Sequence, residues 1–241
     1  MDFSLDGVRS LAVLTGAGIS SESGVPTFRG HGGLCRNYRA EDLATPHAFR
    51  RDHNLVWEWY DWRRGLIGAC EPNAAHYTLA EMEPHFDDFA LITQNVDGLH
   101  RLAGSRNIVE LHGNIWGMRC TRGCRPDWED RTLPLSELPP HCPSCGALAR
   151  PDVVWFGESL PSDALVAAFA AAQRCQVMLV VGTSAVVQPA ASLPLMALQR
   201  GAHVVEFNPQ STPLSEAVDQ VIREPAAIAL PVWWRARLAE G

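Results

Sequence analysis

Five short apolar runs, rich in Val, Leu and Ile, limit most strongly what this chain can fold into. Runs of this kind are typical of strands buried on both faces of a parallel sheet. Helical patterns over residues 162–174 and 189–200 lie before and after the fourth run. Strands that alternate with helices predict an α/β fold with a Rossmann-like, doubly wound parallel sheet. The predicted strands are residues 10–15, 89–93, 107–111, 177–181 and 203–207.

Two segments do not follow this alternation. Residues 28–85 contain helical patterns and no clear strand, and residues 113–151 contain clustered cysteines, several prolines and little apolar periodicity. We interpret them as a helical insertion and a zinc ribbon that together form a small domain. The Rossmann-like domain would then comprise residues 1–27, 86–112 and 152–241.

Composition excludes several classes of protein. Of the 241 residues, 46% are hydrophobic and 20% are charged, which is typical of a folded globular protein and not of a disordered one. No apolar run approaches the roughly 18 residues of a membrane span, and the first residues lack a signal-peptide pattern. We therefore expect a cytoplasmic protein that binds no membrane. The net charge of −7 argues against specific binding to nucleic acid.

Four of the seven cysteines form two close pairs. Three residues separate the first pair and two separate the second, with 17 residues between the pairs. This spacing predicts a tetrahedral zinc ribbon, and four thiolates leave no open coordination position, so one structural zinc ion per chain is expected. A ribbon that binds nucleic acid is the competing interpretation, because several arginines surround it. The predicted ligands are Cys120, Cys124, Cys142 and Cys145.

A glycine-rich turn follows the first predicted strand, at Gly16, Ala17, Gly18 and Ser20. Glycines at this position let the backbone approach a pyrophosphate, and the helix that follows would direct N–H groups toward it. A plain tight turn is the alternative, because Ser21 occupies the third glycine position of the dinucleotide fingerprint.

Polar side chains also follow the other strands. Gln94, Asn95 and Asp97 come after the second strand, and His112 ends the third. Carboxyl ends of parallel strands meet at one edge of a sheet, where ligands bind. A histidine there is a candidate general base, since its pKa lies near working pH. The remaining candidates, suited to ribose and adenine or to ordinary turns, are Gly182, Thr183, Ser184, Asn208, Pro209 and Gln210.

Together these segments resemble the sirtuin family of NAD-dependent protein deacylases, of the bacterial type. The resemblance rests on an ordered set of segments over nearly the whole chain. It implies an enzyme that uses NAD as a co-substrate, carries structural zinc and acts on acyl-lysine proteins or peptides. The segments are residues 16–20, 24–30, 93–97, 110–113, 151–158, 182–184 and 208–209, with the four clustered cysteines.

The resemblance also implies roles for individual residues. The glycine-rich turn would hold the pyrophosphate, with Phe28 and Arg29 on a loop over the nicotinamide side. Gln94, Asn95 and Asp97 would order the nicotinamide ribose. Residues 182–184, residues 208–210 and Ala226 would line the adenosine side. The substrate peptide would add as a strand to Val153, Val154, Trp155 and Phe156.

The implied chemistry consumes NAD without hydride transfer. The acyl oxygen would capture the ribose carbon as nicotinamide leaves. His112 would act as general base toward the ribose hydroxyls, with Asn95 and Asp97 as its catalytic partners. The products would be nicotinamide, O-acyl-ADP-ribose and free lysine.

A helical segment adds a prediction about the acyl group. Tyr60 and Arg63 lie three residues apart, so they share a helix face, and Arg can pair with a carboxylate through two hydrogen bonds. This pattern, with a small residue at Ala44, resembles the sirtuin subgroup that removes succinyl and malonyl groups. An arginine that faces solvent is the alternative. For the whole protein, a mono-ADP-ribosyltransferase and an NAD-sensing regulatory module remain alternatives.

Overall fold

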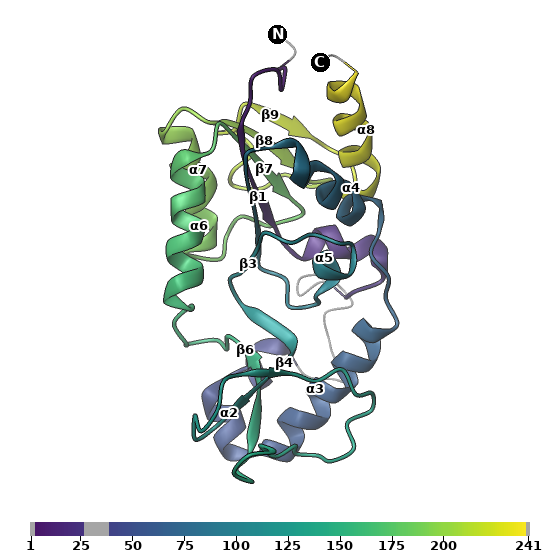
Figure 1. Ribbon diagram of the computed structural model, residues 1–241, viewed down its shortest axis with the longest axis vertical. Helices are drawn as coiled ribbons and strands as arrows, with labels where there is room; N and C mark the ends of the chain where they lie inside the picture. Colours follow the sequence, from purple (N-terminus) through teal and green to yellow (C-terminus); the bar gives the residue numbers. More distant parts are fainter. Residues whose placement is uncertain (1–2, 27–38, 240–241) are drawn as a thin grey trace.

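The computed structural model describes residues 3–26 and 39–239. Within these ranges the chain forms a six-stranded sheet toward one end of the molecule and a three-stranded sheet toward the other (Figure 1). The large sheet is parallel throughout, in the order β3-β2-β1-β7-β8-β9. Its strands are β1 (Ser10–Thr15), β2 (Asp88–Thr93), β3 (Ile108–Glu110), β7 (Val177–Val181), β8 (His203–Phe207) and β9 (Gln220–Ile222).

This strand order confirms the Rossmann-like prediction. Numbered within the sheet, the order is 3-2-1-4-5-6, which reverses direction between β1 and β7. Ligands of such sheets bind at this switch point, beyond the carboxyl ends of the strands. The residues that follow β1 and β7 are Gly16 and Gly182, so the two glycine turns of the sequence meet there.

Helices cover both faces of the large sheet, because successive side chains of a strand point to opposite faces. Leu11 and Val13 of β1 pack against α4 (Ala74–Met82) and α8 (Ala226–Leu238). Ala12 and Leu14 pack against α6 (Ser162–Arg174) and α7 (Leu193–Gln199). The two layers lie on opposite sides of the sheet in Figure 1.

The small sheet packs against helices that precede it in the chain. It has the order β5-β4-β6, with β4 (Gly113–Cys120), β5 (Trp128–Glu129) and β6 (Ala149–Val153) antiparallel. Its core includes Trp57 and Trp59 of α3 and Ile115 of β4. Asp52 caps α3 by accepting a hydrogen bond from the Leu55 amide at 3.0 Å. The helices here are α1 (Ala40–Leu43), α2 (Pro46–Arg51) and α3 (His53–Gly68).

Helix α4 differs from the sequence interpretation. It falls within the expected helical insertion 28–85, yet Ala75, Leu79 and Met82 belong to the core of the large sheet. Its principal neighbour is α8 rather than α2 or α3. An apolar helix face does not identify its partner, so a sequence pattern alone could not assign α4 to the large part.

The turn after β1 leads into a short helix. The glycine-rich turn predicts a helix here without giving its type, and the structure has a 3₁₀ helix, η1 (Ala17–Ser23). The remaining short elements are η2 (Glu83–His85), α5 (Leu99–Leu102) and η3 (Ala190–Ser192). None of the helices in the described residues combines the length and apolar character that a membrane crossing requires.

Candidate active site

Two glycine turns pack against each other at the switch point. The Gly16 amide donates to the Val181 carbonyl at 3.1 Å, and the Gly18 amide donates to the Gly182 carbonyl at 2.7 Å. A Cβ at Gly16 would lie 2.8 Å from Cβ of Thr183, and one at Gly18 would lie 2.7 Å from Cα of Gly182. Both positions therefore require glycine, and the resulting cradle of bare backbone suits a pyrophosphate.

Side chains from three strand ends tie these turns together. Gln94 Nε2 donates to the Thr183 hydroxyl at 3.0 Å, and Asn208 Nδ2 donates to the Thr183 carbonyl at 2.8 Å. The ends of β2, β7 and β8 thereby form one polar edge. The structure brings these predicted residues together at the carboxyl ends of the strands, as open α/β sheets do around a nucleotide.

Ser20, Asn95 and Asp97 form a buried hydrogen-bonded group beside the first turn. The Ser20 hydroxyl donates to Asp97 Oδ2 at 2.8 Å and accepts from Asn95 Nδ2 at 3.2 Å. Asn95 Nδ2 also donates to the Gly16 carbonyl at 3.1 Å. Burial raises the pKa of Asp97, while hydrogen bonds from the Leu99 amide and the Ser20 hydroxyl act in the opposite direction. These contacts hold the amide of Asn95 and the carboxyl of Asp97 in fixed orientations.

His112 lies in the connection between the two sheets, between β3 and β4. Its Nδ1 lies 2.9 Å from the Gln94 carbonyl oxygen, which can only accept, so Nδ1 carries the hydrogen. Nε2 of the neutral ring is then left as a proton acceptor. Burial lowers the pKa of His112, partly offset by the Gln94 carbonyl, so the ring is neutral at working pH. This is the protonation state that a general base needs.

Two further histidines, which the sequence reasoning did not identify, are buried behind this group. His76 of α4 lies 3.4 Å from the Ser20 hydroxyl, and its Nδ1 accepts from the Asn73 amide at 3.3 Å. His100 lies 3.0 Å from the Thr15 hydroxyl. Burial lowers the pKa of His76 to about 4 and that of His100 well below its ordinary value. Only the packing of α4 and α5 on the sheet shows their proximity to the site.

The four residues expected to pair with the substrate peptide lie at the end of β6 and directly after it. Val153 ends β6, and the Val154 amide donates to the His112 carbonyl at 2.9 Å. The Phe156 amide donates to the Ala44 carbonyl at 2.9 Å. This segment therefore connects the candidate base with the small residue of the expected acyl pocket.

Tyr60 and Arg63 both point into the core of the small part. Tyr60 is fully buried, and Arg63 is 8% exposed, so Arg63 is not the solvent-facing residue of the alternative interpretation. The guanidinium of Arg63 lies 4.8 Å from the ring centroid of Trp59 and acts on the pKa values of both Tyr60 and Asp97. Arg64 is directed elsewhere, onto the main chain and carboxylate of Asp130. Ala44 is buried as well.

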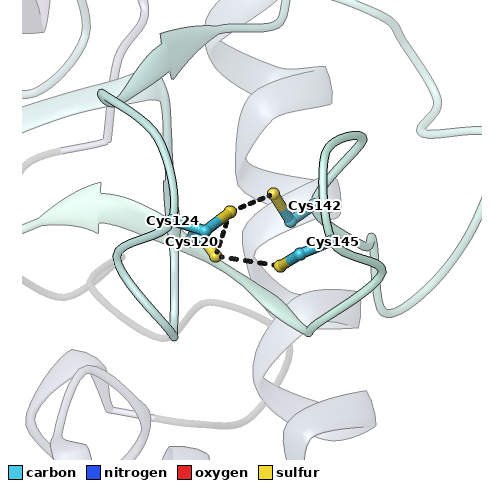
Figure 2. Close-up of side chains that lie close together, drawn as sticks. All are labelled: Cys120, Cys124, Cys142 and Cys145. Carbon is cyan, nitrogen blue, oxygen red and sulfur yellow. Dashed lines mark hydrogen bonds between the residues drawn. The ribbon is translucent and has the colours of Figure 1, made fainter.

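The four clustered cysteines come together between the end of β4 and the turn before β6 (Figure 2). Their sulfurs all lie within 4.8 Å of one another, with 3.5 Å between Cys120 and Cys124 and 3.5 Å between Cys124 and Cys142. A zinc ion with tetrahedral Zn–S bonds of about 2.3 Å needs sulfurs about 3.8 Å apart, so the set fits zinc. A closed set of four thiolates is a structural site rather than a catalytic one.

Several expected contact residues lie at the margin of the site. Ser184, Pro209 and Gln210 are exposed, and Ala226 is packed in the core at the start of α8. Phe28 and Arg29 lie outside the described residues. Ala17 is half-buried in η1.

The structure combines a Rossmann-like sheet, which has the glycine turns at its carboxyl edge, with a separate four-cysteine module. This combination defines the class of protein to which the chain is compared. A family model described as "Sir2 family" matches residues 16–189. The chain is 59% identical over 203 residues to "NAD-dependent protein deacylase 1" of Caldanaerobacter subterraneus subsp. tengcongensis, covering 84% of each chain.

Solved structures agree with this match. A Sir2 homologue in complex with NAD superposes with a TM-score of 0.92 at 46% identity, covering 98% of this chain and 92% of that one. A Sir2 protein with a p53 peptide and NAD⁺ has a TM-score of 0.81 at 32% identity, covering 98% and 95%. The chain belongs to the Sir2 family.

Proposed function

We propose that this NAD-dependent protein deacylase removes succinyl and malonyl groups, as well as acetyl groups, from lysine side chains of proteins. The observation that carries the acidic-acyl preference is a buried arginine, Arg63, one helical turn after the buried Tyr60. Ala44, Phe49 and Trp155 belong to the same apolar cluster as Tyr60.

A buried guanidinium in such surroundings favours an acidic partner. A guanidinium pairs with the negative charge of a carboxylate through two charge-assisted hydrogen bonds, which are stronger than hydrogen bonds between neutral groups. The distal carboxylate of a succinyl or malonyl group supplies that charge, and a phenol can donate one further hydrogen bond to it. An acetyl group supplies neither, and the small side chain of Ala44 leaves space for the longer acyl chain.

The reaction needs positioning and one base. NAD supplies a glycosidic bond to a cationic leaving group, nicotinamide, whose departure leaves the ribose carbon open to capture by the acyl oxygen. Asn95 and Asp97, held by Ser20, would orient the ribose beside the glycine turns. His112 would take a proton from a ribose hydroxyl at Nε2, the nitrogen not bound to the Gln94 carbonyl. The deprotonated ribose oxygen would attack the imidate carbon formed by that capture, and one water molecule would be consumed as the bond to the lysine nitrogen breaks. The products would be nicotinamide, O-acyl-ADP-ribose and free lysine.

The zinc would have no part in this chemistry. The cysteines hold the ends of β4 and the turn before β6, and β6 runs directly into the segment that we expect to pair with the peptide. That pairing would use the main chain of residues 153–156, so the identity of the substrate protein would matter little.

The test compares succinyl-, malonyl- and acetyl-lysine forms of one peptide, with products identified by mass spectrometry. Arg63→Met should lower kcat/KM for the succinyl peptide at least about tenfold, mainly through KM, because a charge-assisted contact contributes about 1.5–3 kcal/mol. The matched control is Arg51→Met, at an exposed arginine at the end of α2. Equal losses for succinyl and acetyl peptides would remove the acidic-acyl preference, and ADP-ribose found on protein would indicate mono-ADP-ribosyl transfer instead.

A further inference from the structure

Trp155 makes a buried hydrogen bond to the tyrosine of the expected acyl pocket. Its indole N–H donates to the Tyr60 hydroxyl oxygen at 2.9 Å, and the two side chains are 2% and 0% exposed. An indole nitrogen can only donate, so the phenol oxygen is the acceptor in this bond. The hydroxyl hydrogen of Tyr60 must therefore point away from Trp155.

That hydrogen stays on the phenol throughout the working range of pH. Burial raises the pKa of Tyr60 to about 12, and the neighbouring Arg63 guanidinium offsets only part of the effect. Tyr60 is therefore a neutral donor next to a buried cation. A donor and a cation side by side match the two oxygens of one carboxylate.

The orientation of Trp155 is itself fixed by an ion pair. The guanidinium carbon of Arg150 lies 3.6 Å from the centroid of the Trp155 ring. Arg150 donates to both carboxylate oxygens of Glu158, at 2.7 and 2.8 Å. Glu158 Oε2 also accepts from the Trp155 amide at 2.9 Å. Arg150 thus contacts the face of the Trp155 ring, and Glu158 binds the Trp155 main-chain amide.

A second tryptophan holds the helix that carries Tyr60. Trp57, three residues earlier on α3, donates from its indole nitrogen to the Ala149 carbonyl of β6 at 2.9 Å. Helix α3 and the β6 segment are therefore joined at two points. The distance between Tyr60 and the segment beside the substrate is fixed from both sides.

We infer that Trp155, held by the Arg150–Glu158 pair, is a positioning residue that sets acyl selectivity by directing the Tyr60 hydroxyl toward the distal carboxylate of the substrate. Trp155 acts through Tyr60 and touches no reacting atom. This inference rests on the proposed function, because it needs an acidic acyl group in the pocket. It adds a residue 95 positions from Tyr60 in sequence to the determinants of selectivity.

The test is a double-mutant cycle of Trp155→Phe and Tyr60→Phe. Phenylalanine keeps an aromatic ring beneath Arg150 and removes the N–H donor. The readout is the ratio of kcat/KM for succinyl and acetyl peptides, so any general loss from altered peptide pairing cancels. Trp155→Phe should lower this ratio about three- to tenfold, which is the range for one neutral hydrogen bond.

The double variant decides whether Trp155 acts through Tyr60. If it does, Trp155→Phe should leave the ratio of Tyr60→Phe unchanged, and the loss in the wild-type background should appear in KM rather than kcat. Multiplicative effects of the two changes, or equal losses for both peptides, would overturn the inference. Failure of the proposed function is distinguishable, because Arg63→Met would then leave the ratio unchanged.

A second variant keeps the test decisive if Trp155→Phe folds poorly. Glu158→Gln keeps an acceptor for the Trp155 amide but removes the charge that holds Arg150. It should lower the ratio by roughly twofold, within the range of a weakened neutral hydrogen bond, and only when Tyr60 is present. The same loss in the Tyr60→Phe background would contradict a role through Tyr60.

Discussion

His112 Nδ1 donates to the Gln94 carbonyl at 2.9 Å, so one main-chain oxygen at the end of β2 sets the tautomer of the candidate base. The side chain of the same glutamine donates to Thr183 after β7. The dinucleotide edge and the base therefore share a residue. The Arg101–Glu110 ion pair and the hydrogen bond from Asn114 to Glu110 fix the chain on either side of His112.

Replacing His112, the candidate base, should abolish deacylation and leave the fold intact. His112→Ala should lower kcat/KM by roughly 10²–10⁴, the usual contribution of a general base. Zinc content and the thermal unfolding midpoint should stay near those of the wild type. The control is His47→Ala, at an exposed histidine of α2. Activity within about tenfold of wild type would remove His112 from the role of base.

Metal analysis should find one tightly held zinc per chain, and Cys142→Ser should lose it. Cys142 is buried in the cluster, and structural zinc contributes directly to folding. The midpoint of thermal unfolding should fall by roughly 10 °C or more, since each 1 kcal/mol moves it by about 2–4 °C in a chain of this size. Cys70→Ser, outside the cluster, should change neither metal content nor the midpoint. A stable, active protein without zinc would contradict this.

The stability of the protein should fall in acid through His76. Its pKa is lowered from 6.5 to about 4 by burial, so below pH 6.5 the unfolded chain binds a proton that the folded chain does not. Stability is then fully present above pH 6.5 and is lost as the pH falls toward 4, by about 3 kcal/mol in total. The raised pKa of Asp97 changes stability with pH in the opposite direction. Its effect cancels in a comparison of wild type with His76→Gln, because both proteins contain Asp97.

The measurement is the free energy of unfolding between pH 4 and 7 for wild type and His76→Gln. The free energy of unfolding should change less steeply with pH in His76→Gln than in wild type, whatever the absolute stability of the variant. His47→Gln, at an exposed position, should keep the wild-type slope. Parallel curves for wild type and His76→Gln would show that His76 is not the group responsible.

Gly182 should tolerate no side chain. It has a φ of +61°, and a Cβ there would overlap the Ile19 amide nitrogen and the Gly18 backbone. Gly7 has a φ of +72° with nothing near a Cβ, so it isolates the cost of the backbone conformation. Gly7→Ala should cost about 1 kcal/mol and Gly182→Ala about 3 kcal/mol or more, measured by urea unfolding. Equal costs would show that the two turns can separate without penalty.

The large sheet was predictable because β1, β2, β7 and β8 are buried on both faces, which leaves uninterrupted apolar runs. Strands β1, β7 and β8 begin and end at the predicted residues. Strand β9 was missed, because its three residues are half-buried and show no alternation of apolar and polar side chains. The order of the strands follows from crossover connections, which apolar periodicity does not encode.

The candidate site was predictable where function imposes a local motif, as in the glycine turns and the cysteine pairs. It was not predictable where distant segments meet. Trp155 and Tyr60 lie 95 positions apart, and His76 reaches Ser20 only because α4 packs on the large sheet. Tyr60 and Arg63 could be paired by helix spacing, but their burial depends on the tertiary packing of α3.

The run of chain from β6 through Val154 links the cysteine module to the carbonyl of His112. We therefore expect metal occupancy and catalytic geometry to be coupled, although the four clustered cysteines belong to the small part and not to the glycine turns. A chelator would consequently inhibit this enzyme slowly, at the rate of zinc release, and saturating NAD or peptide would not restore the lost turnover by competition.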